Sequence, residues 1–415
     1  MLDLKLVRED PDRVRAALAR RGRADAVDEL LELDARRREL LPRVEGERAA
    51  QNKAGEAIAE AKRSGADASE EIEEVRAVKA RIDQLQGDVE GVEQRLDALI
   101  ASLPNLPADS APDDEEVLRE VGEGGRTGRD HLELLDGLVD MEAGARLSGS
   151  RFAYLRGPLV LIELALVRWA IELLSEEGFE PVVPPVLVRE EALFGTGFLP
   201  DTEQQIYELP QDDLFLSGTS EVALAMLHGG QILDAEALPR RYAGFSTCFR
   251  REAGAAGKDT RGIFRVHQFD KVEMFSFVEP EESEAEHERL LAIEERIFTA
   301  LEIPYRVVNI AASDLGASAA KKYDLEAWLP GQDRYREVTS CSNTTEYQAR
   351  RLGARYRPER EAPPRHLHTL NGTAVAVGRT IIAIAENHQR DDGSIAVPDV
   401  LHGFGAPAEI AAAES

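Results

Sequence analysis

The feature that most constrains the fold of this chain is an apolar repeat between residues 75 and 99. Its apolar side chains follow one another at spacings that alternate between three and four residues, which places them along one face of a coiled-coil helix. The repeat consists of Val75, Val78, Ile82, Leu85, Val89, Val92, Leu96 and Leu99. The stretch before it, residues 26–63, has matching apolar residues near its base, and its seam becomes small and polar toward its end. The two stretches predict a hairpin of two long antiparallel helices.

Local signals predict where these helices begin, bend and end. After a break at residues 64–66, Asp67 and Glu70 form a capping box that opens the second helix, so the hairpin spans about residues 26–101. At ~1.5 Å per residue, helices of ~32–37 residues reach ~50 Å. Pro42 lies inside the first helix and removes a backbone hydrogen bond, so we expect a kink near residues 38–42. On spacing alone, such a hairpin is more often a structural or oligomerising element than a ligand-binding one.

The charge of the chain is unevenly distributed. The 415 residues carry a formal net charge of −28, which by itself argues against a nucleic-acid partner, because phosphate contacts need Lys and Arg. Residues 1–105 are nearly balanced, with 19 Lys and Arg against 24 Asp and Glu. Local runs such as Arg36-Arg37-Arg38 therefore leave room for a cationic face, although each run is also typical of an ordinary solvated helix surface.

Cysteines and apolar runs exclude several classes of protein. The two cysteines, Cys248 and Cys341, are far apart in the sequence, so we expect neither a disulfide framework nor a zinc site. The N-terminus is charged and does not read as a secretion signal. The most apolar stretch, residues 159–174, is short and carries charges, so we expect no membrane span. A cytoplasmic enzyme or binding protein is the default expectation.

Three regions follow from these patterns. Residues 1–103 form the helical arm, residues 104–116 have the Pro-rich, acidic composition of a linker, and residues 117–415 mix strand-like runs with helices. Short connections between the strand-like runs favour an antiparallel sheet, so we predict the α+β fold class. The sequence contains neither G-x-G-x-x-G nor G-x-x-x-x-G-K-[ST], so a nucleotide would be bound by neither the Rossmann nor the P-loop device.

Charged residues interrupt the apolar strands at five places. These are Thr219-Ser220-Glu221, Arg250-Arg251-Glu252, residues 262–273, Arg336–Ser340 and Asn371–Thr380. Any one of them is compatible with an internal salt bridge, but five on one sheet predict a polar cavity, because a buried charge needs a partner. Arginines there suit phosphate or carboxylate, and carboxylates suit ammonium, hydroxyl or Mg²⁺. Phe269 offers a stacking face for a base.

These residues, in this order, resemble the bacterial-type seryl-tRNA synthetases, a family of class II synthetases. FRREAG and KDTRGIFRVHQFDKVE are similar to class II motif 2, NGTAVAVGRTIIAIAEN to motif 3, and the helix before residue 178 with FEPVVPPVLV to motif 1. Thr219-Ser220-Glu221 resembles the serine-binding T-x-E element, and REVTSCSN resembles the strand that contacts ATP and metal. The resemblance covers nearly the whole chain. It implies a class II antiparallel sheet flanked by helices, a coiled-coil arm that binds tRNA, and a homodimer built through motif 1.

The resemblance also implies a role for each matching residue. The catalytic residues would be Arg250, Glu252, Glu273 and Arg379. Serine would be bound by Thr219, Ser220, Glu221, Arg250, Glu273 and Thr373. ATP would be bound by Arg250, Arg251, Glu252, Arg265, Val266, Phe269, Glu337, Val338, Thr339, Ser340 and Arg379. Mg²⁺ would be held by Glu337 and Ser340, and tRNA would be contacted by Arg36, Arg37, Arg38, Lys258, Asp259 and Thr260.

The family pattern further implies how the ligands would lie. Arg250 would meet both the α-phosphate of ATP and the carboxylate of serine, and Phe269 and Arg379 would sandwich the adenine. How Glu221 and Glu273 divide the ammonium and the hydroxyl of serine does not follow from the sequence.

The implied activity is the ATP-dependent activation of L-serine to seryl-adenylate and its transfer to the 3′ end of serine tRNA, and by family habit of selenocysteine tRNA. A paralogue with the same chemistry, serving antibiotic resistance or a biosynthetic pathway, fits the sequence equally well. A ligase that loads serine onto a carrier protein would lack the arm, which this chain keeps. A non-catalytic binding protein predicts losses at Arg250, Glu273, Glu337 or Arg379, all of which are present.

Overall fold

The computed structural model describes residues 1–65, 67, 69–200, 205–253, 259 and 261–412 of the chain. It consists of two compact units, Leu2–Pro104 and a second unit formed by Met1 with Asn105–Ser415. We describe each unit by itself.

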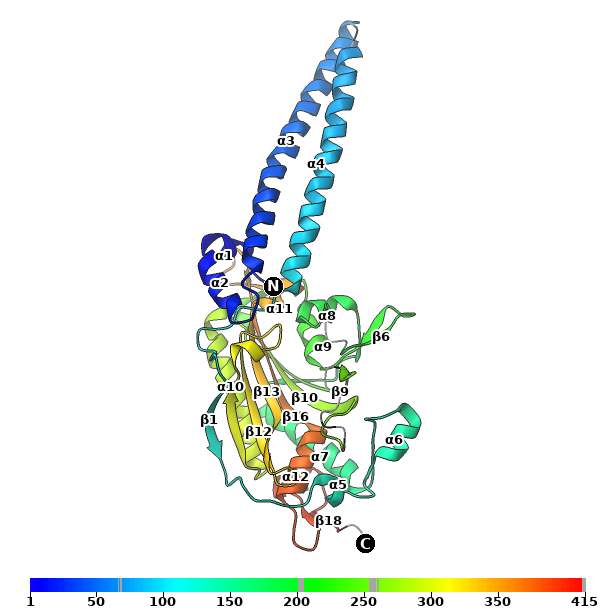
Figure 1. Cartoon of the computed structure of the whole chain (residues 1–415), viewed down its shortest axis with the longest axis vertical. Coiled ribbons are helices and arrows are strands. Elements are labelled where there is room, and N and C mark those ends of the chain that lie inside the picture. Colours follow the sequence, from blue (N-terminus) through cyan, green and yellow to red (C-terminus); the bar gives the residue numbers. More distant parts are fainter. Residues whose placement is uncertain (66, 68, 201–204, 254–258, 260, 413–415) are drawn as a thin grey trace. The chain divides into compact units, whose positions relative to one another are not determined.

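The first unit is the helical hairpin predicted from the apolar repeat. Its helices are α1 (Leu4–Glu9), α2 (Pro11–Ala19), α3 (Ala26–Ser64) and α4 (Ser69–Ser102). Helices α3 and α4 run side by side over their length (Figure 1). Most of the predicted seam of α4 is buried, including Ile82, Leu85 and Val89, and Leu85 and Val89 pack on Leu40 and Val44 of α3. The prediction of a coiled-coil arm is confirmed.

The turn of the hairpin depends on local backbone chemistry. Gly65 ends α3 with a φ of +72°, a left-handed conformation that glycine adopts without strain. The Asp67 carboxylate then accepts a hydrogen bond from the Ser69 backbone N–H at 3.1 Å, so it serves the first residue of α4. Pro42 lies within α3, and the helix continues through it although Pro42 has no N–H to donate to the Arg38 carbonyl.

The second unit is built on a large sheet. Within the described residues the sheet has eight strands. In spatial order they are β1 (Glu116–Val121), β11 (Tyr305–Asn309), β12 (Lys321–Leu329), β13 (Arg334–Thr345), β16 (His368–Ala376), β10 (Gln268–Val278), β9 (Arg240–Phe249) and β4 (Glu180–Val182). Neighbouring strands are antiparallel apart from β4 and β9, which are parallel. The predicted α+β class is confirmed.

The described part of the second unit also contains eight α-helices. They are α5 (His131–Leu134), α6 (Met141–Ser148), α7 (Pro158–Glu176), α8 (Glu190–Thr196), α9 (Glu221–Met226), α10 (Ser283–Ala300), α11 (Tyr347–Leu352) and α12 (Val377–Asn387). Apolar side chains of α7, α10 and α12 join those of the central strands in the largest buried cluster. Helix α12 follows β16 directly, so the end of a central strand leads into a helix start (Figure 1).

Short strands form four small sheets at the periphery. They are β5 (Leu187–Val188) with β7 (Leu214–Leu216) and β6 (Tyr207–Leu209); β15 (Arg365–His366) with β14 (Arg355–Arg357) and β8 (Ile232–Asp234); β2 (Val139–Asp140) with β3 (Tyr154–Leu155); and β17 (Ile395–Ala396) with β18 (Glu409–Ile410). None of the helices in the described part of the chain is both long enough and apolar enough to cross a membrane.

The stretch with linker composition is packed rather than free. The Asn105 backbone N–H donates to the Ala317 carbonyl at 2.7 Å, and Ala108 donates to the Ala320 carbonyl at 2.8 Å. Ala111 is buried in a small cluster with Val308. Strand β1 begins at Glu116 and pairs with β11 at the sheet edge. Because most of these contacts are backbone hydrogen bonds, the composition of the segment does not reveal them.

Candidate active site

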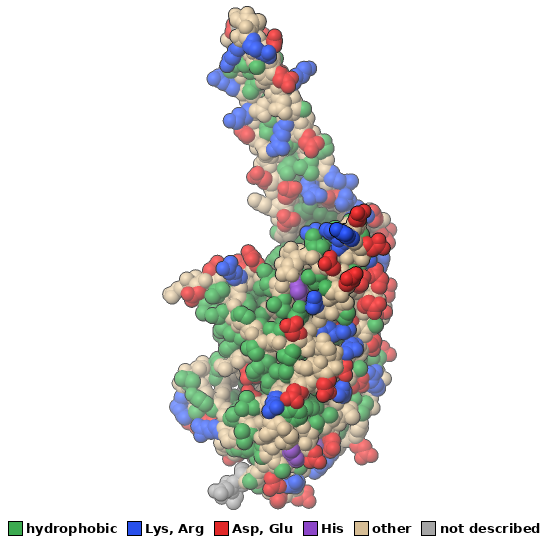
Figure 2. Space-filling model, turned by 180° about the vertical axis from the view of Figure 1, so that it is seen from behind, with side chains coloured by type: hydrophobic (Ala, Val, Ile, Leu, Met, Phe, Trp, Pro, Cys, Tyr) green, Lys and Arg blue, Asp and Glu red, His purple; other side chains and the backbone are tan. Residues whose placement is uncertain are grey.

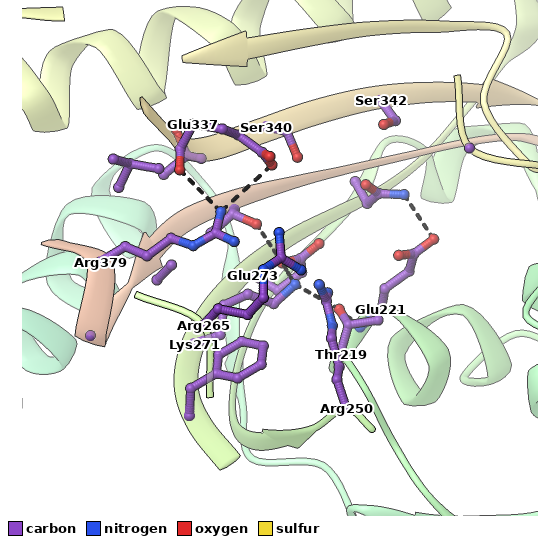
Figure 3. Close-up of a pocket in the computed structure, with 18 of the residues that line it drawn as sticks. Thr219, Glu221, Arg250, Arg265, Lys271, Glu273, Glu337, Ser340, Ser342 and Arg379 are labelled. Carbon is purple, nitrogen blue, oxygen red and sulfur yellow. Dashed lines mark hydrogen bonds and ion pairs between the residues drawn. The ribbon is translucent and has the colours of Figure 1, made fainter. Parts of the chain in front are cut away.

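A polar cavity of about 310 Å³ lies on the central strands of the sheet, where β10, β13 and β16 meet the start of α12. Figure 3 shows the labelled side chains converging on it from several elements. Most of the residues predicted from the sequence line this cavity: Thr219, Glu221, Arg250, Glu252, Arg265, Val266, Phe269, Glu273, Glu337, Val338, Thr339, Ser340, Thr373 and Arg379. Five sequence clusters that are far apart in the chain thus supply one site.

Two of the residues predicted to bind serine or ATP, Ser220 and Arg251, do not line the cavity. The Ser220 hydroxyl is buried and donates to the Gly244 carbonyl at 3.3 Å, so it faces the sheet. The Arg251 guanidinium lies 5.9 Å from the centre of the Tyr207 ring, and its side chain is exposed. The neighbouring residue in each case, Thr219 or Arg250, does face the cavity.

Part of the predicted tRNA contact lies beside the cavity. The Asp259 carboxylate forms an ion pair with Arg336 at 2.7 Å and a longer one with Arg265 at 3.8 Å. Burial alone would raise the pKa of Asp259, but the hydrogen bond from Arg336 and the positive charges of Arg336 and Arg265 together outweigh burial and hold the pKa below its usual range. Lys258 and Thr260, the two other residues predicted here, lie outside the described residues.

One end of the cavity is organised around a lysine. The Lys271 ammonium donates to the Thr219 hydroxyl at 2.7 Å and forms an ion pair with Glu273 (Figure 3). The Thr373 hydroxyl donates to the same Glu273 carboxylate at 3.3 Å. The residues come from two paired strands, since Glu273 of β10 lies opposite Thr373 of β16.

The second carboxylate at this end has neutral partners. Glu221 accepts hydrogen bonds from the side-chain amides of Gln348 at 2.7 Å and Asn371 at 2.8 Å. Burial, followed by repulsion from Glu273, raises the pKa of Glu221 to about 7 against the pull of Lys271. The charge of Glu221 is therefore poised close to neutral pH and would be stabilised by an added cation.

The arginines extend toward the other end of the cavity, beginning with Arg250 beside Thr219 (Figure 3). The Arg250 Nε donates to the Gly218 carbonyl at 3.2 Å, and its guanidinium lies 5.4 Å from the centre of the Phe269 ring. Arg265 donates to the Glu252 carboxylate at 2.5 Å. Backbone carbonyls and one carboxylate thus orient these cations and leave other N–H groups to meet an anion.

Arg379 enters this end from the first turn of α12. It donates to the Glu337 carbonyl at 3.0 Å, and its guanidinium lies 4.8 Å from the centre of the Phe264 ring. Burial lowers the pKa of Arg379 from its usual value. Phe269 and Arg379, predicted to hold a base between them, both line the cavity.

Glu337 is the carboxylate best placed to serve as a metal ligand. Burial would raise its pKa, but Lys322, then Arg379 and Arg250, outweigh burial and hold the pKa below its usual range, so the oxygen ligand stays ionised. Within the described residues, no group of three or more His, Cys, Asp or Glu side chains is arranged to hold a metal ion. The donors Glu337 and Ser340 therefore fit Mg²⁺ that is held mainly by phosphate oxygens, as is usual for this ion.

Several polar residues around the cavity had no role in the sequence-based prediction, among them Lys271, Lys322, Gln348 and Asn371. Lys271 and Asn371 lie two positions before Glu273 and Thr373 on their strands, so the alternation of a strand places each pair on one face. This signal was available in the sequence. Lys322 on β12 lines the cavity, and Gln348 on α11 reaches it only through its hydrogen bond to Glu221. Neither residue had a comparable signal, since their elements carry none of the sequence motifs.

The fold and the cavity together define a class of enzyme. Residues 205–388 match the family model described as the tRNA synthetase class II core domain (G, H, P, S and T). This match includes the central strands and the cavity residues on them. The second unit is the catalytic core of a class II aminoacyl-tRNA synthetase.

The particular family follows from the rest of the chain. Residues 1–107 match the seryl-tRNA synthetase N-terminal domain. The chain is 49% identical to the serine–tRNA ligase of Thermobifida fusca and 51% identical to that of Acidothermus cellulolyticus, with 97% of this chain covered and 97% and 98% of those proteins. The crystal structure of seryl-tRNA synthetase from Pyrococcus horikoshii complexed with ATP superposes with a TM-score of 0.94 at 42% identity over the whole of both chains. This chain belongs to the seryl-tRNA synthetase family.

Proposed function

We propose that this protein activates L-serine with ATP to form seryl-adenylate and transfers the seryl group to the 3′ end of serine tRNA. The observation that carries the proposal is the cavity, in which an arginine-rich end adjoins an end with two buried carboxylates. Such a site receives a triphosphate and an α-amino acid side by side. The likeness to the serine–tRNA ligases supports serine as the amino acid.

In the first step, the carboxylate of serine attacks the α-phosphorus of ATP, a C–O–P linkage forms, and pyrophosphate leaves. The attacking carboxylate is already ionised, so no general base is required. Arg250 binds the α-phosphate and the serine carboxylate and stabilises the negative charge that grows on the phosphoryl oxygens. Because Gly218 and Phe269 already orient Arg250, little reorganisation is needed.

The remaining ATP contacts follow the cavity walls. Phe269 and Arg379 hold the adenine, Glu252 lies near its amino group, and Arg265 and Arg379 meet the phosphate tail. The backbone of Val266 completes this wall.

Glu337 and Ser340 are the protein ligands that we assign to Mg²⁺, which offsets phosphate charge when bound. The carboxylate of Glu337 is available for this role because the surrounding cations keep it ionised.

Serine binds at the carboxylate end, contacted by Thr219, Glu221, Glu273 and Thr373. A site whose buried polar groups pair with the hydroxyl of serine rejects alanine, since alanine would leave those groups without partners. In the second step, the 3′-terminal adenosine of the tRNA attacks the carbonyl carbon of the adenylate, and AMP leaves.

The helical hairpin is the tRNA-binding element in this proposal. Arg36, Arg37 and Arg38 contact the phosphate backbone, so that recognition depends on RNA shape and charge rather than on a base code. By the same reasoning the protein also charges selenocysteine tRNA, which likewise receives serine. We place the reaction in the cytoplasm.

The active form in this proposal is a homodimer formed through α7 and the strand that follows it. Helix α7 carries the exposed apolar residues Val160, Leu161 and Leu164, and Val183 is exposed just after β4. Apolar surface of this kind is typical of an interface between protein chains. A second copy of this chain is the partner implied by the likeness to motif 1.

The test measures serine-dependent exchange of pyrophosphate into ATP, then serylation of serine tRNA and of selenocysteine tRNA. The proposal expects exchange and charging of serine tRNA. Failure of exchange would disprove the proposed activity. Exchange without any tRNA charging would instead favour a carrier-protein ligase, which the arm argues against. A specialised paralogue would behave like the housekeeping enzyme in this test, and gene neighbourhood separates the two.

A further inference from the structure

Lys271 lies at the centre of the carboxylate end of the cavity, although neither the T-x-E element nor the arginines of motif 2 point to it. The residue is 5% exposed and belongs to β10. Figure 3 shows its ammonium group between Thr219 and Glu273, with Glu221 nearby. A buried lysine needs a partner, and Glu273 is that partner.

The charges at this end of the cavity can be counted. Glu221 and Glu273 carry two negative charges when ionised, and Lys271 carries one positive charge, so one negative charge is left. The α-ammonium of an amino acid balances this remaining charge. The carboxylate of the same amino acid is balanced by Arg250. A neutral side chain therefore completes the balance, and a cationic side chain would leave an uncompensated charge in a buried site.

The hydrogen bonds to Glu273 refine this count. Among the described residues, the Lys271 ammonium and the Thr373 hydroxyl both contact Oε2 of Glu273. Its Oε1 is therefore the oxygen available to a ligand. A hydroxyl donates to Oε1 without changing the charge, whereas an ammonium at the same place would be repelled by Lys271.

From this geometry we propose that Lys271 is a specificity-determining residue that makes the side-chain subsite accept a neutral hydroxyl and reject an ammonium group. The inference rests on the proposed function and divides the labour of the two glutamates. Glu273, compensated by Lys271, receives the side-chain hydroxyl. Glu221, whose partners Gln348 and Asn371 are neutral amides, receives the α-ammonium.

The decisive ligand is 2,3-diaminopropionate, which replaces the hydroxyl of serine with an amino group of similar size that binds as an ammonium group where a carboxylate faces it. Without Lys271, the two glutamates balance both ammonium groups of this amino acid. We expect the ratio of kcat/KM for serine over 2,3-diaminopropionate in pyrophosphate exchange to fall by ~100-fold or more in Lys271→Met, an effect of the size that one buried polar mismatch produces. Lys271→Arg keeps the positive charge and should preserve the preference for serine.

The matched control is Lys322→Met, which removes another lysine that lines the same cavity on the Glu337 side. Lys322→Met should lower pyrophosphate exchange with serine and with 2,3-diaminopropionate in the same proportion. Calorimetric titration of Lys271→Met with 2,3-diaminopropionate gives a second readout that does not depend on catalysis, and Lys271→Gln serves where Lys271→Met does not fold.

The outcomes separate this inference from the proposed function. If the wild-type protein does not activate serine, the proposed function fails whatever the variants do. A second outcome is that the wild-type protein activates serine while Lys271→Met and Lys271→Gln both lower kcat/KM equally for serine and for 2,3-diaminopropionate. In that case Lys271 only supports the fold of the pocket, and the inference is overturned. A selective gain toward 2,3-diaminopropionate, reversed in Lys271→Arg, supports it.

Discussion

Arginine side chains occur in two different physical situations in this protein, in the cavity and on the arm. In the cavity, Arg250 and Arg379 are oriented by backbone carbonyls and aromatic rings, in surroundings buried enough to lower the pKa of Arg379. On the arm, Arg36 forms an exposed ion pair with Glu39 at 2.6 Å. Figure 2 shows cationic and anionic side chains intermingled over the arm surface.

This difference predicts how each set acts. A charge in a low-dielectric, preorganised site has a large effect on its own, because water neither screens it nor has to reorganise around it. An exposed charge is screened by salt and contributes little alone. We therefore expect single substitutions in the cavity to abolish a chemical step and single substitutions on the arm to change tRNA affinity gradually. The following predictions are ordered by their expected effect on tRNA charging.

The largest effect is expected for Arg250→Ala. Removing a preorganised donor from a site where charge develops should lower serine-dependent pyrophosphate exchange by about 10³-fold, while the protein stays folded. Arg251→Ala is the matched control, because its side chain lies toward Tyr207 and does not line the cavity. An equal loss of pyrophosphate exchange in Arg250→Ala and Arg251→Ala would show that a position in the cavity gives an arginine no special role. The contrast between the arginines of the cavity and those of the arm would then have no basis.

The next effect concerns Glu221 and depends on pH. Burial and the repulsion from Glu273 raise the pKa of Glu221 to about 7, so the protonated, neutral form predominates below that pH. An ammonium ligand needs the ionised form. We expect kcat/KM for serine to be constant at higher pH and to fall about tenfold for each pH unit below the pKa.

Glu221→Gln should remove this pH dependence and lower kcat/KM for serine by ~100-fold at pH 8, because a buried ammonium would lose its ionic partner. The amide of Asn371 offers a control, since Asn371→Asp adds a carboxylate next to Glu221 and should move the pH dependence to higher pH. A wild-type profile that is flat between pH 6 and 8 would contradict the poised charge of Glu221.

The same contrast explains how far the sequence leads in each region. The arm follows from periodicity, since Ile82, Leu85 and Val89 are buried as the heptad pattern predicts. The packed course of residues 105–112 does not follow, because its contacts are backbone hydrogen bonds such as that from Ala108 to Ala320. The cluster at residues 262–273 is expected within a strand, but β10 begins only at Gln268.

The late start of that strand has a local cause. Gly262 has a φ of +72°, a conformation outside the range of a strand, and a Cβ there would lie 2.1 Å from Nε2 of His131. The contact partner is distant in sequence, so no local pattern reveals it.

In the catalytic unit, motif residues marked the cavity, but the orientation of neighbours did not follow from them. Ser220 turns toward Gly244 while Thr219 faces the cavity, because α9 starts at this point and successive side chains diverge. Gln348 reaches Glu221 from a helix more than a hundred residues away, and only the folded chain brings them together. Strand alternation was the one rule that would have added Lys271 and Asn371.

On the arm, the three predicted tRNA contacts are not equivalent. Arg37 and Arg38 lie 3.5 and 3.4 Å from the carboxylate of Asp34, which is buried, and Arg8 approaches the same carboxylate at 3.5 Å. Arg36 pairs only with an exposed glutamate among the described residues. Charge reversal of all three would therefore disturb the arm itself as well as its RNA contact.

Single substitutions sharpen this prediction. Arg36→Gln should leave pyrophosphate exchange unchanged, weaken tRNA binding several-fold and reduce the salt dependence of binding by about one phosphate contact. Arg37→Gln and Arg38→Gln should also lower the free energy of unfolding of the arm, because Asp34 loses compensation. Binding titrations at several salt concentrations, with unfolding curves of each variant, make the measurement. A salt dependence that Arg36→Gln does not change would place the phosphate contact elsewhere on the arm.

The smallest effect on charging is expected for Pro42→Ala. Pro42 is exposed, lies inside α3 and withholds a hydrogen bond from the Arg38 carbonyl, at a cost of ~3 kcal/mol in a helix interior. Alanine restores the donor, so we expect slower backbone hydrogen exchange around residues 38–46 and a charging rate within about twofold of wild type, since an exposed change of this kind adds no charge for tRNA. Unchanged rates of backbone hydrogen exchange would mean that the packing of Leu40 and Val44 against α4 already determines the local stability. A loss of charging with intact pyrophosphate exchange would instead mean that Pro42 sets the path of the arm, and the arm would then act through its shape as well as through its charge.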